Sequence, residues 1–144
     1  MSCIVSLEKC NSYSQNEVDA SVRKLLFNLG GISKFIKKNQ KILIKPNIVK
    51  GMKPEECGTT NPAVIEAVIK IIKENKCEIF VGDHPFADNT TEAMKICGIY
   101  DACKKYDVKI AAFDKKINIK NEDGLVVKEF QLTRYFEEVD AIIN

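Results

Sequence analysis

Residues 41–83 leave few folds open to this chain, because they predict a strand, a loop, a helix and a second strand in succession. The first apolar run centres on Leu43 and stops at Pro46, which has no amide hydrogen for a strand ladder. The second centres on Phe80 and stops at Gly82. Two strands joined by a crossover helix of this size form a parallel, right-handed unit. Both strands therefore end at the same edge of a sheet, which is where ligands bind in open α/β folds.

The helix of this unit has clear signals at its start. Asn61 is a favourable N-cap, and Pro62 suits the first helical position. A wide apolar face follows at helical spacing, made of residues 64, 65, 68, 69, 71 and 72. The loop before the helix, residues 48–60, is longer than the usual connection of ~2–6 residues. Such long loops tend to be functional.

Further elements extend this unit on both sides. Residues 4–7 predict an initial strand. Ser14 then begins a helix with a capping box, in which Glu17 reaches back to the N-cap, and the glycines at 30–31 end it. After residue 83 the pattern predicts a loop at 86–89 and then a helix that is capped by Asn89 or Thr90 and ends near 97. A turn near 101–106 and a strand at 108–113 follow. The last predicted elements are a hairpin around 121–124, a helix at 133–138 and a strand at 141–144.

The order of these elements predicts an α/β fold. We expect three layers around a mostly parallel, Rossmann-like or flavodoxin-like sheet, with a β-hairpin near the C-terminus. A chain of 144 residues is long enough for its own core, so we expect a single α/β domain over residues 1–144. The last predicted strand has nothing after it to cover it. We therefore expect this domain to be the N-terminal part of a longer one.

Composition and charge exclude several classes of protein. A net charge of +2 provides no strong field to attract nucleic acid or an anionic membrane. No apolar run approaches the ~20 residues of a membrane span, and the N-terminus lacks the pattern of a signal peptide. We expect a cytoplasmic protein that binds neither nucleic acid nor membrane. Glycine-rich dinucleotide and Walker motifs are absent from the sequence, so we do not expect nucleotide binding by those mechanisms.

The six cysteines do not form a metal-binding pattern. No two of them have the two-residue spacing that zinc and iron–sulfur ligand loops use. Reduced thiols in a protein interior behave as small apolar side chains, which is the reading we prefer here. Cys57 is the exception to follow, because it lies in the long loop before the helix.

Polar side chains gather where the two strands end, and they suit an anion. Lys45 leaves the first strand, and Thr60 lies next to the helix start, where unpaired amides and the helix dipole favour negative charge. A carboxylate or a phosphate is the expected ligand. The alternative is that Lys45 is solvated and that the threonines only cap the helix. The predicted ligand-binding residues are Asn47, Thr59, Thr60 and Asn61.

The residues after the second strand suggest catalysis or metal binding. Asp83 could hold Mg²⁺, act as a base or orient a lysine, and it could equally cap a turn. His84 could serve as an acid or base, or be a turn residue before a proline. Asp88 could join Asp83 in a divalent-metal site. The candidate catalytic residues are Lys45, Asp83 and His84, and the candidate metal ligands are Asp83 and Asp88.

Four short motifs in this order resemble a known family. They are Lys45-Pro46-Asn47, Thr59-Thr60-Asn61-Pro62, Gly82-Asp83 and the closing run Val-Asp-Ala-Ile-Ile-Asn at 139–144. Across essentially the whole chain the sequence resembles the family called domain of unknown function 362. The family occurs mainly in anaerobic bacteria and archaea, and many members carry a ferredoxin-like domain with two four-iron clusters. A lysine- and histidine-bearing segment follows the final strand in the family, so this chain is expected to hold part of the family's site.

The resemblance implies no certain cofactor for this chain. It has no cysteine run to ligate a cluster, so iron–sulfur clusters are implied only for longer relatives. Two hypotheses about function remain. In the first, an enzyme or half of one binds a small anion with Lys45 as electrostatic clamp and Asp83 as base or metal ligand, and a ferredoxin-like domain or redox partner supplies electrons. In the second, the same loops form a non-catalytic docking module for a partner protein.

Overall fold

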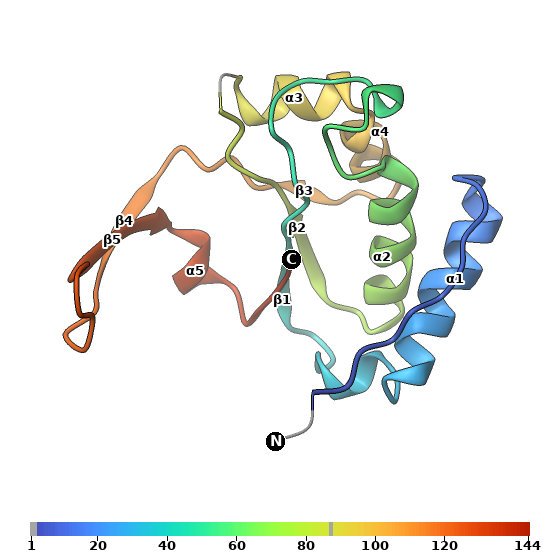
Figure 1. Cartoon of the computed structure of the whole chain (residues 1–144), viewed down its shortest axis with the longest axis horizontal. Helices are drawn as coiled ribbons and strands as arrows, with labels where there is room; N and C mark the ends of the chain where they lie inside the picture. Colours follow the sequence, from blue (N-terminus) through green and yellow to red (C-terminus); the bar gives the residue numbers. More distant parts are fainter. Residues whose placement is uncertain (1–2, 87) are drawn as a thin grey trace.

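The computed structural model describes residues 3–86 and 88–144. Met1, Ser2 and Ala87, which the sequence analysis placed at the N-terminus and in the loop at 86–89, lie outside the described residues. A four-stranded parallel sheet forms the centre of the molecule, and a separate two-stranded hairpin projects from it (Figure 1). The predicted α/β fold with a mostly parallel sheet and a C-terminal hairpin is therefore confirmed.

The sheet has the strand order β3-β2-β1-β6. Its strands are β1 (Lys41–Ile44), β2 (Glu78–Val81), β3 (Lys109–Ile110) and β6 (Ala141–Ile143). In register, Leu43 lies beside Phe80 on one side and beside Ile142 on the other, and every pair is parallel. This order matches the first four strands, 3-2-1-4, of the Rossmann fold. The direction of strand addition reverses between β1 and β6.

Four helices cover one face of the sheet (Figure 1). They are α1 (Gln15–Asn28), α2 (Pro62–Glu74), α3 (Thr90–Ile96) and α4 (Ile99–Lys105). Ile42 and Val81 point from the strands into the main core, where Ile69 of α2 is fully buried against them. Helix α1 packs on the outer side of α2 (Figure 1). Burial of β-branched and aliphatic side chains on this face supplies most of the driving force for folding.

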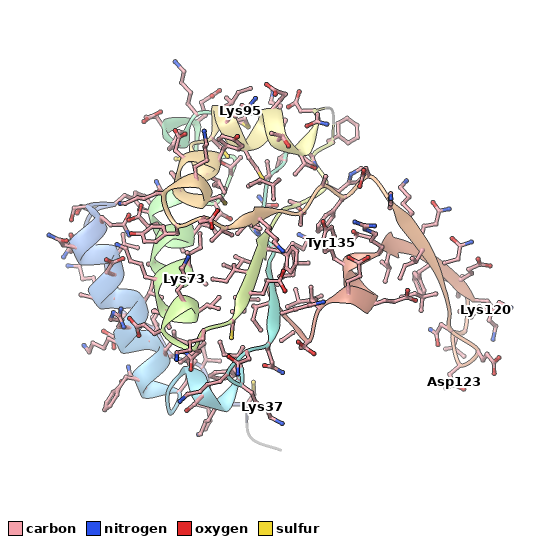
Figure 2. All side chains as sticks on the ribbon, turned by 180° about the vertical axis from the view of Figure 1, so that it is seen from behind. Lys37, Lys73, Lys95, Lys120, Asp123 and Tyr135 are labelled. Atoms are coloured by element: carbon pink, nitrogen blue, oxygen red, sulfur yellow. The ribbon has the colours of Figure 1, made fainter. Side chains whose placement is uncertain are left out.

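The opposite face of the sheet has a thinner cover. It consists of α5 (Tyr135–Glu138) and the hairpin strands β4 (Lys116–Lys120) and β5 (Glu129–Thr133). Leu43 of the sheet is fully buried in a small second core with Tyr135 and Ala111. Figure 2 shows Tyr135 between the sheet and the hairpin, with Lys120 and Asp123 at the far end of the hairpin. Sheet, helical layer and thin cover make three layers.

The predicted start of α2 and the predicted end of α1 are confirmed, and capping interactions define both. The side chain of Asn61 accepts a hydrogen bond from the amide of Ala63, and Pro62 is the first residue of α2. At the end of α1, the amide of Gly31 donates to the carbonyl of Leu26 with both glycines at positive φ. Short 3₁₀ turns follow at η1 (Ile32–Lys34) and in the long loop at η2 (Pro54–Glu56).

The predicted strand at residues 4–7 is wrong. This segment is not part of any strand in the described chain, and Val5 and Leu7 are almost fully exposed. Side chains of α1 hold it instead: Asn28 donates to Glu8, and Lys24 pairs with Glu8 at 2.7 Å. Alternating apolar residues favour an extended backbone, but a strand also needs a partner edge, which the local pattern does not encode.

Four other details differ from the predictions. The capping box of α1 does not form: Ser14 is the N-cap, but Glu17 accepts from the amide of Asn11 and the hydroxyl of Ser12. The hairpin turn is longer than predicted, because its second strand begins at Glu129. The predicted turn near 101–106 is a full helix, α4, and the predicted strand at 108–113 is reduced to β3.

The six cysteines are free thiols in the described chain. Cys97 and Cys103 are buried in the main core, as expected for cysteines that act as small apolar side chains. Burial raises the pKa of the Cys103 thiol to about 12, so this thiol stays protonated and unreactive at neutral pH. Cys57 is exposed and adopts a left-handed backbone conformation after η2.

Glu66 of α2 is the centre of an ion-pair network that joins three helices. It accepts from Lys105 at 2.8 Å and from the hydroxyl of Tyr106 at 2.9 Å, and it pairs with Lys70 at 3.1 Å. Lys70 also pairs with Asp19 of α1 at 2.6 Å. Burial opposes ionisation of Glu66, but the hydrogen bonds from Lys105, Lys70 and Tyr106 outweigh it. The pKa of Glu66 therefore lies below its ordinary value.

We expect Glu66→Gln to lower the free energy of unfolding by about 1–2 kcal/mol at pH 7. A carboxylate with a lowered folded-state pKa stabilises the fold above its unfolded pKa of about 4.3, and this contribution disappears as pH falls through the folded pKa. The difference between wild type and variant should therefore be constant above about pH 5 and shrink below about pH 4. Urea denaturation at a series of pH values measures it.

Glu92→Gln is the matched control. Within the part of the chain that the structure describes, Glu92 pairs only with Lys95, one helical turn away. Its side chain is 61% exposed, so its removal should change stability by less than about 0.5 kcal/mol. Equal losses from the two substitutions, or a Glu66→Gln effect that persists below pH 3, would show that the network does not stabilise the fold.

Candidate functional site

Lys45 and Asp83 lie side by side at the carboxyl edge of the sheet. The ammonium group of Lys45, one residue after β1, is 2.9 Å from Oδ1 of Asp83, two residues after β2. The other oxygen, Oδ2, accepts a hydrogen bond of 2.7 Å from the amide of Ile48. The hydroxyl of Thr90 donates to the carbonyl oxygen of Asp83 at 3.0 Å. The parallel strand ends that the sequence predicts thus bring these two side chains into direct contact.

Asp83 is a fixed, buried carboxylate, whereas Lys45 faces solvent on one side. Asp83 is 7% exposed, and both of its oxygens already accept a hydrogen bond or an ion pair. The side chain of Lys45 is 36% exposed. An ammonium group has three donors, and Asp83 is the only residue of the described chain with which Lys45 forms an ion pair. Of the roles considered for Asp83, the geometry suits the orientation of a lysine best.

A crevice opens beside Lys45 at the point where the strand order reverses. It lies between the ends of β1 and β6 and the start of α2, and its volume is about 350 Å³. In doubly wound sheets this switch point is where ligands bind, because the connections on either side leave in opposite directions. Its polar lining comes from Lys45, Asn47, Thr60 and Asn144, and its apolar lining from residues that include Val64 and Ile143.

Two predicted ligand-binding residues, Asn47 and Thr60, hold each other in place in this crevice. The amide of Asn47 donates to the hydroxyl oxygen of Thr60 at 2.9 Å, and the amide of Thr60 donates to the carbonyl of Asn47 at 2.9 Å. The Thr60 hydroxyl can still donate its own hydrogen to a ligand. Thr59 pairs with Ile48 through its backbone, and it is not among the residues that line the crevice.

The start of α2 is already occupied by its own cap. Pro62 has no amide hydrogen, the amide of Ala63 donates to the side chain of Asn61, and the amide of Val64 donates to the backbone carbonyl of Asn61. Asn61 lines a different groove, between α2 and α4. An anion in the crevice would therefore be held by the side chains of Lys45, Asn47 and Thr60 and not by helix amides.

The two candidate metal ligands each accept a backbone hydrogen bond. Oδ2 of Asp88 accepts from the amide of Gly51 at 2.6 Å, which ties the long loop to the loop after β2. Within residues 3–86 and 88–144, no group of three or more histidine, cysteine, aspartate or glutamate side chains is placed to hold a metal ion.

His84 lines a second cavity with residues that the sequence analysis missed. This cavity of about 310 Å³ lies on the opposite face of the sheet, where the hairpin joins it, and Lys45 lines it too. The other lining residues are Phe113, Lys116, Gln131, Leu132, Thr133 and Phe136. They come from the hairpin, from α5 and from the segment after β3, whose position relative to the strand ends no sequence pattern indicates.

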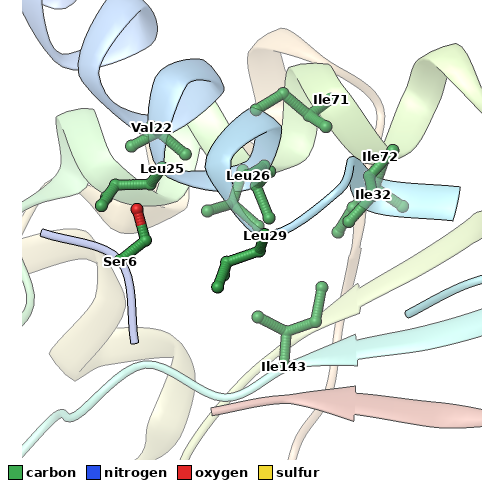
Figure 3. Close-up of a pocket in the computed structure, with 10 residues that line it drawn as sticks. Ser6, Val22, Leu25, Leu26, Leu29, Ile32, Ile71, Ile72 and Ile143 are labelled. Carbon is green, nitrogen blue, oxygen red and sulfur yellow. The ribbon is translucent and has the colours of Figure 1, made fainter. Parts of the chain in front are cut away.

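An apolar pocket adjoins the crevice, because Val68 and Ile143 line both, but none of the predicted site residues lines this pocket. Figure 3 shows it between α1, α2 and the end of β6, with Leu25, Leu29 and Ile143 among the side chains that face it. Its volume is about 260 Å³, and Ser6 provides its only polar side chain among the described residues. A lining of this kind has no charged or titratable side chain among the described residues.

Comparison with known proteins identifies the family. The sequence profile of the family described as Domain of unknown function (DUF362) matches residues 42–144. The chain belongs to the DUF362 family. The match begins at β1 and extends through β6, so it includes both strand ends, the long loop and the hairpin. Helix α1 lies before the matched range.

The chain is also similar to a thylakoid-associated protein of Synechocystis sp. The two are 29% identical over 140 residues, which make up 97% of this chain and 43% of that protein. The chain thus spans less than half the length of this curated relative. No solved structure matches the chain. In the described part of this DUF362 protein, no helix is both long enough and apolar enough to cross a membrane.

Proposed function

We propose that this DUF362 protein binds a small anionic ligand, a carboxylate or a phosphate, at the switch point of its sheet. The observation that carries the proposal is the position of Lys45, whose ammonium group is held by Asp83 at 2.9 Å beside the crevice between β1 and β6. Lys45 is the only basic residue among the described residues that line this crevice.

The crevice offers chemistry that complements such a ligand. Lys45 supplies a positive charge. The Thr60 hydroxyl and the side-chain amide of Asn47, whose nitrogen also donates to the Gly58 carbonyl at 3.5 Å, supply neutral donors. A hydrogen bond between an ammonium group and an anion is roughly twice as strong as one between neutral groups. In this proposal Lys45 is the electrostatic clamp, and Asp83 fixes its direction.

We expect inorganic phosphate or citrate to raise the melting temperature of the wild-type protein. A ligand at about 100 times its dissociation constant adds about 2.7 kcal/mol of stability, which corresponds to several degrees for a chain of this size. Lys45→Ala should weaken anion binding at least about tenfold, because it removes the charge that the ligand contacts. Thermal shift with isothermal titration calorimetry measures both effects.

Lys50→Ala is the control for net charge. Lys50 lies in the long loop at residues 48–60 and is exposed, but it does not line the crevice. Lys50→Ala should leave anion affinity unchanged within about twofold, since salt largely screens an exposed charge that does not contact the ligand. Equal affinity for anions in wild type and Lys45→Ala would disprove the proposal.

A second candidate function, a docking module, is favoured by apolar side chains on the same loops. Phe86 is 95% exposed and Val49 is 49% exposed, and the amide of Phe86 donates to the carbonyl of Val49. Exposed apolar residues next to each other are typical of protein contact sites. In longer relatives the contact would be with a ferredoxin-like domain or a redox partner. Phe86→Ser would abolish such docking while leaving the response to phosphate intact, and so separates the two functions.

A further inference from the structure

The cavity on the hairpin side of Lys45 has the composition of a ligand site. Its volume of about 310 Å³ lies within the range of small-molecule pockets, roughly 300–1,000 Å³. Its basic groups come from three separate segments: Lys45 after β1, His84 after β2 and Lys116 on β4. No acidic residue is among the described residues that line it. Asp83 offsets part of the charge of Lys45, whereas Lys116 forms no ion pair in the described chain.

The hydroxyl group of Thr133 is a second, independent observation in favour of a ligand, because it has no hydrogen-bond partner among the described residues. Thr133 is 8% exposed, and its hydroxyl oxygen is buried. A buried hydroxyl left without a partner costs about 1–3 kcal/mol, so such groups are rare in folded proteins. Thr133 lines the cavity, and it lies directly opposite Lys116 in the hairpin register, which puts the two side chains on one face.

The rest of the cavity wall is apolar. Phe113 stacks on Tyr135 with ring centroids 5.9 Å apart, and it presents its other surface to the cavity with Leu132. Phe136 also lines the cavity and is 47% exposed. An inorganic anion would leave this apolar surface in contact with water. An organic anion with a flat apolar body would cover it.

We propose that the hairpin-side cavity is a second site, which takes an amphipathic organic acid whose apolar body occupies it. Its carboxylate lies between Lys45 and Lys116 and accepts the hydrogen of the Thr133 hydroxyl. Phe113, Leu132 and Phe136 contact the apolar body. This site lies on the opposite face of the sheet from the crevice and shares only Lys45 with it, so the inference goes beyond the proposed function.

The test compares three probes on the wild-type chain by isothermal titration calorimetry: 2-naphthoate, acetate and inorganic phosphate. We expect 2-naphthoate to bind at least about tenfold more tightly than acetate, because only the larger acid buries the apolar wall. Acetate and naphthoate carry the same charged group, so the difference isolates the contribution of the apolar body.

Thr133→Val is the decisive variant. Valine has nearly the same shape without the hydroxyl, so it removes the buried unpartnered group and should leave the melting temperature unchanged or raised. It should weaken 2-naphthoate binding about tenfold and leave phosphate binding within about twofold of wild type. Lys116→Ala should also weaken naphthoate binding. Lys120→Ala, at the far end of β4, is the control and should not.

The outcomes separate this inference from the proposed function. Equal affinity for 2-naphthoate and acetate, or unchanged naphthoate binding in Thr133→Val, would overturn the inference. Phosphate binding that depends on Lys45 would in that case leave the proposed function standing. If neither phosphate nor either acid bound the wild-type chain, both proposals would fall together.

Discussion

Asp83→Asn is expected to lower the free energy of unfolding by about 2–4 kcal/mol, which is roughly 5–12 °C in melting temperature for a chain of this length. The carboxylate accepts a hydrogen bond from the Ile48 amide at 2.7 Å and forms an ion pair with the Lys45 ammonium group at 2.9 Å. An asparagine has only one accepting atom, so its amide group would face one of these two donors. A buried donor opposite another donor is strongly unfavourable.

The same substitution also tests the orienting role of Asp83. Removal of a negative charge beside the crevice should by itself strengthen anion binding. If Asp83 fixes the direction of Lys45, Asp83→Asn should instead weaken phosphate binding, by about tenfold. Tighter binding in the variant would show that Asp83 does not orient the lysine. Calorimetric titration at a temperature where the variant is still folded measures this.

Asp88→Asn is the matched control for Asp83→Asn. Asp88 is exposed and accepts one hydrogen bond, from the amide of Gly51. Asparagine keeps an oxygen that can accept this bond, so the loss should be below about 1 kcal/mol. A loss for Asp88→Asn as large as that for Asp83→Asn would show that any carboxylate in these loops has the same effect, and the buried position of Asp83 would then have no special role.

Gly82→Ala is expected to cost about 3 kcal/mol, because the added methyl group has no space. A Cβ at position 82 would lie 2.0 Å from the carbonyl oxygen of Ala111 and 2.9 Å from its carbonyl carbon, both of them backbone atoms. Relief of this clash requires the segment after β3 to move away from the end of β2. The movement would break the hydrogen bond from the Ala111 amide to the Val81 carbonyl, which is 2.8 Å long.

Gly31→Ala is the control, because it introduces backbone strain without a steric clash. Gly31 has φ of 88°, and a Cβ there would have only the hydroxyl of Ser33 nearby, at 3.9 Å. It should therefore cost about 1–3 kcal/mol, from backbone strain alone. Chemical denaturation of both variants provides the comparison. A smaller loss for Gly82→Ala than for Gly31→Ala would contradict the close approach of β2 to the segment after β3.

Much of the sheet was predictable because its strands are short apolar runs that end at residues with known backbone effects. Pro46 ends β1, and the Gly82-Asp83 pair ends β2. The Asn61 cap and Pro62 defined the start of α2 in the same way. Once two parallel strands and a crossover helix were recognised, the meeting of Lys45 with Asp83 followed from topology.

The hairpin shows what local patterns do not determine. A four-residue turn at 121–124 would place Lys120 opposite Leu125, but in the structure Lys120 pairs with Glu129. The shift carries Lys116 from a position opposite Glu129 to one opposite Thr133, next to the second cavity. The register thus depends on how residues 125–128 form a wide loop, and on the packing of Tyr135 against the sheet.

The predicted strand at residues 4–7 was wrong for a related reason. Residues 4–7 have the composition of a strand, yet polar contacts with α1 hold them, with Asn28 bonded to Ser6 and to Glu8. The free edge of a sheet is a property of the assembled molecule, so no window of a few residues can show whether one is within reach.

The pairing of β6 with β1 determines the order in which the protein can assemble. Asp140 accepts from the backbone amide of Lys41 at 2.7 Å across 99 residues of chain, whereas β1 and β2 are joined by a single helix and its loop. Contacts between residues so distant in sequence form slowly, because the entropy of closing a long loop must be overcome first. The helical layer and the β1–β2 pair can therefore form early, and the crevice beside Lys45 takes shape only after β6 has paired with β1.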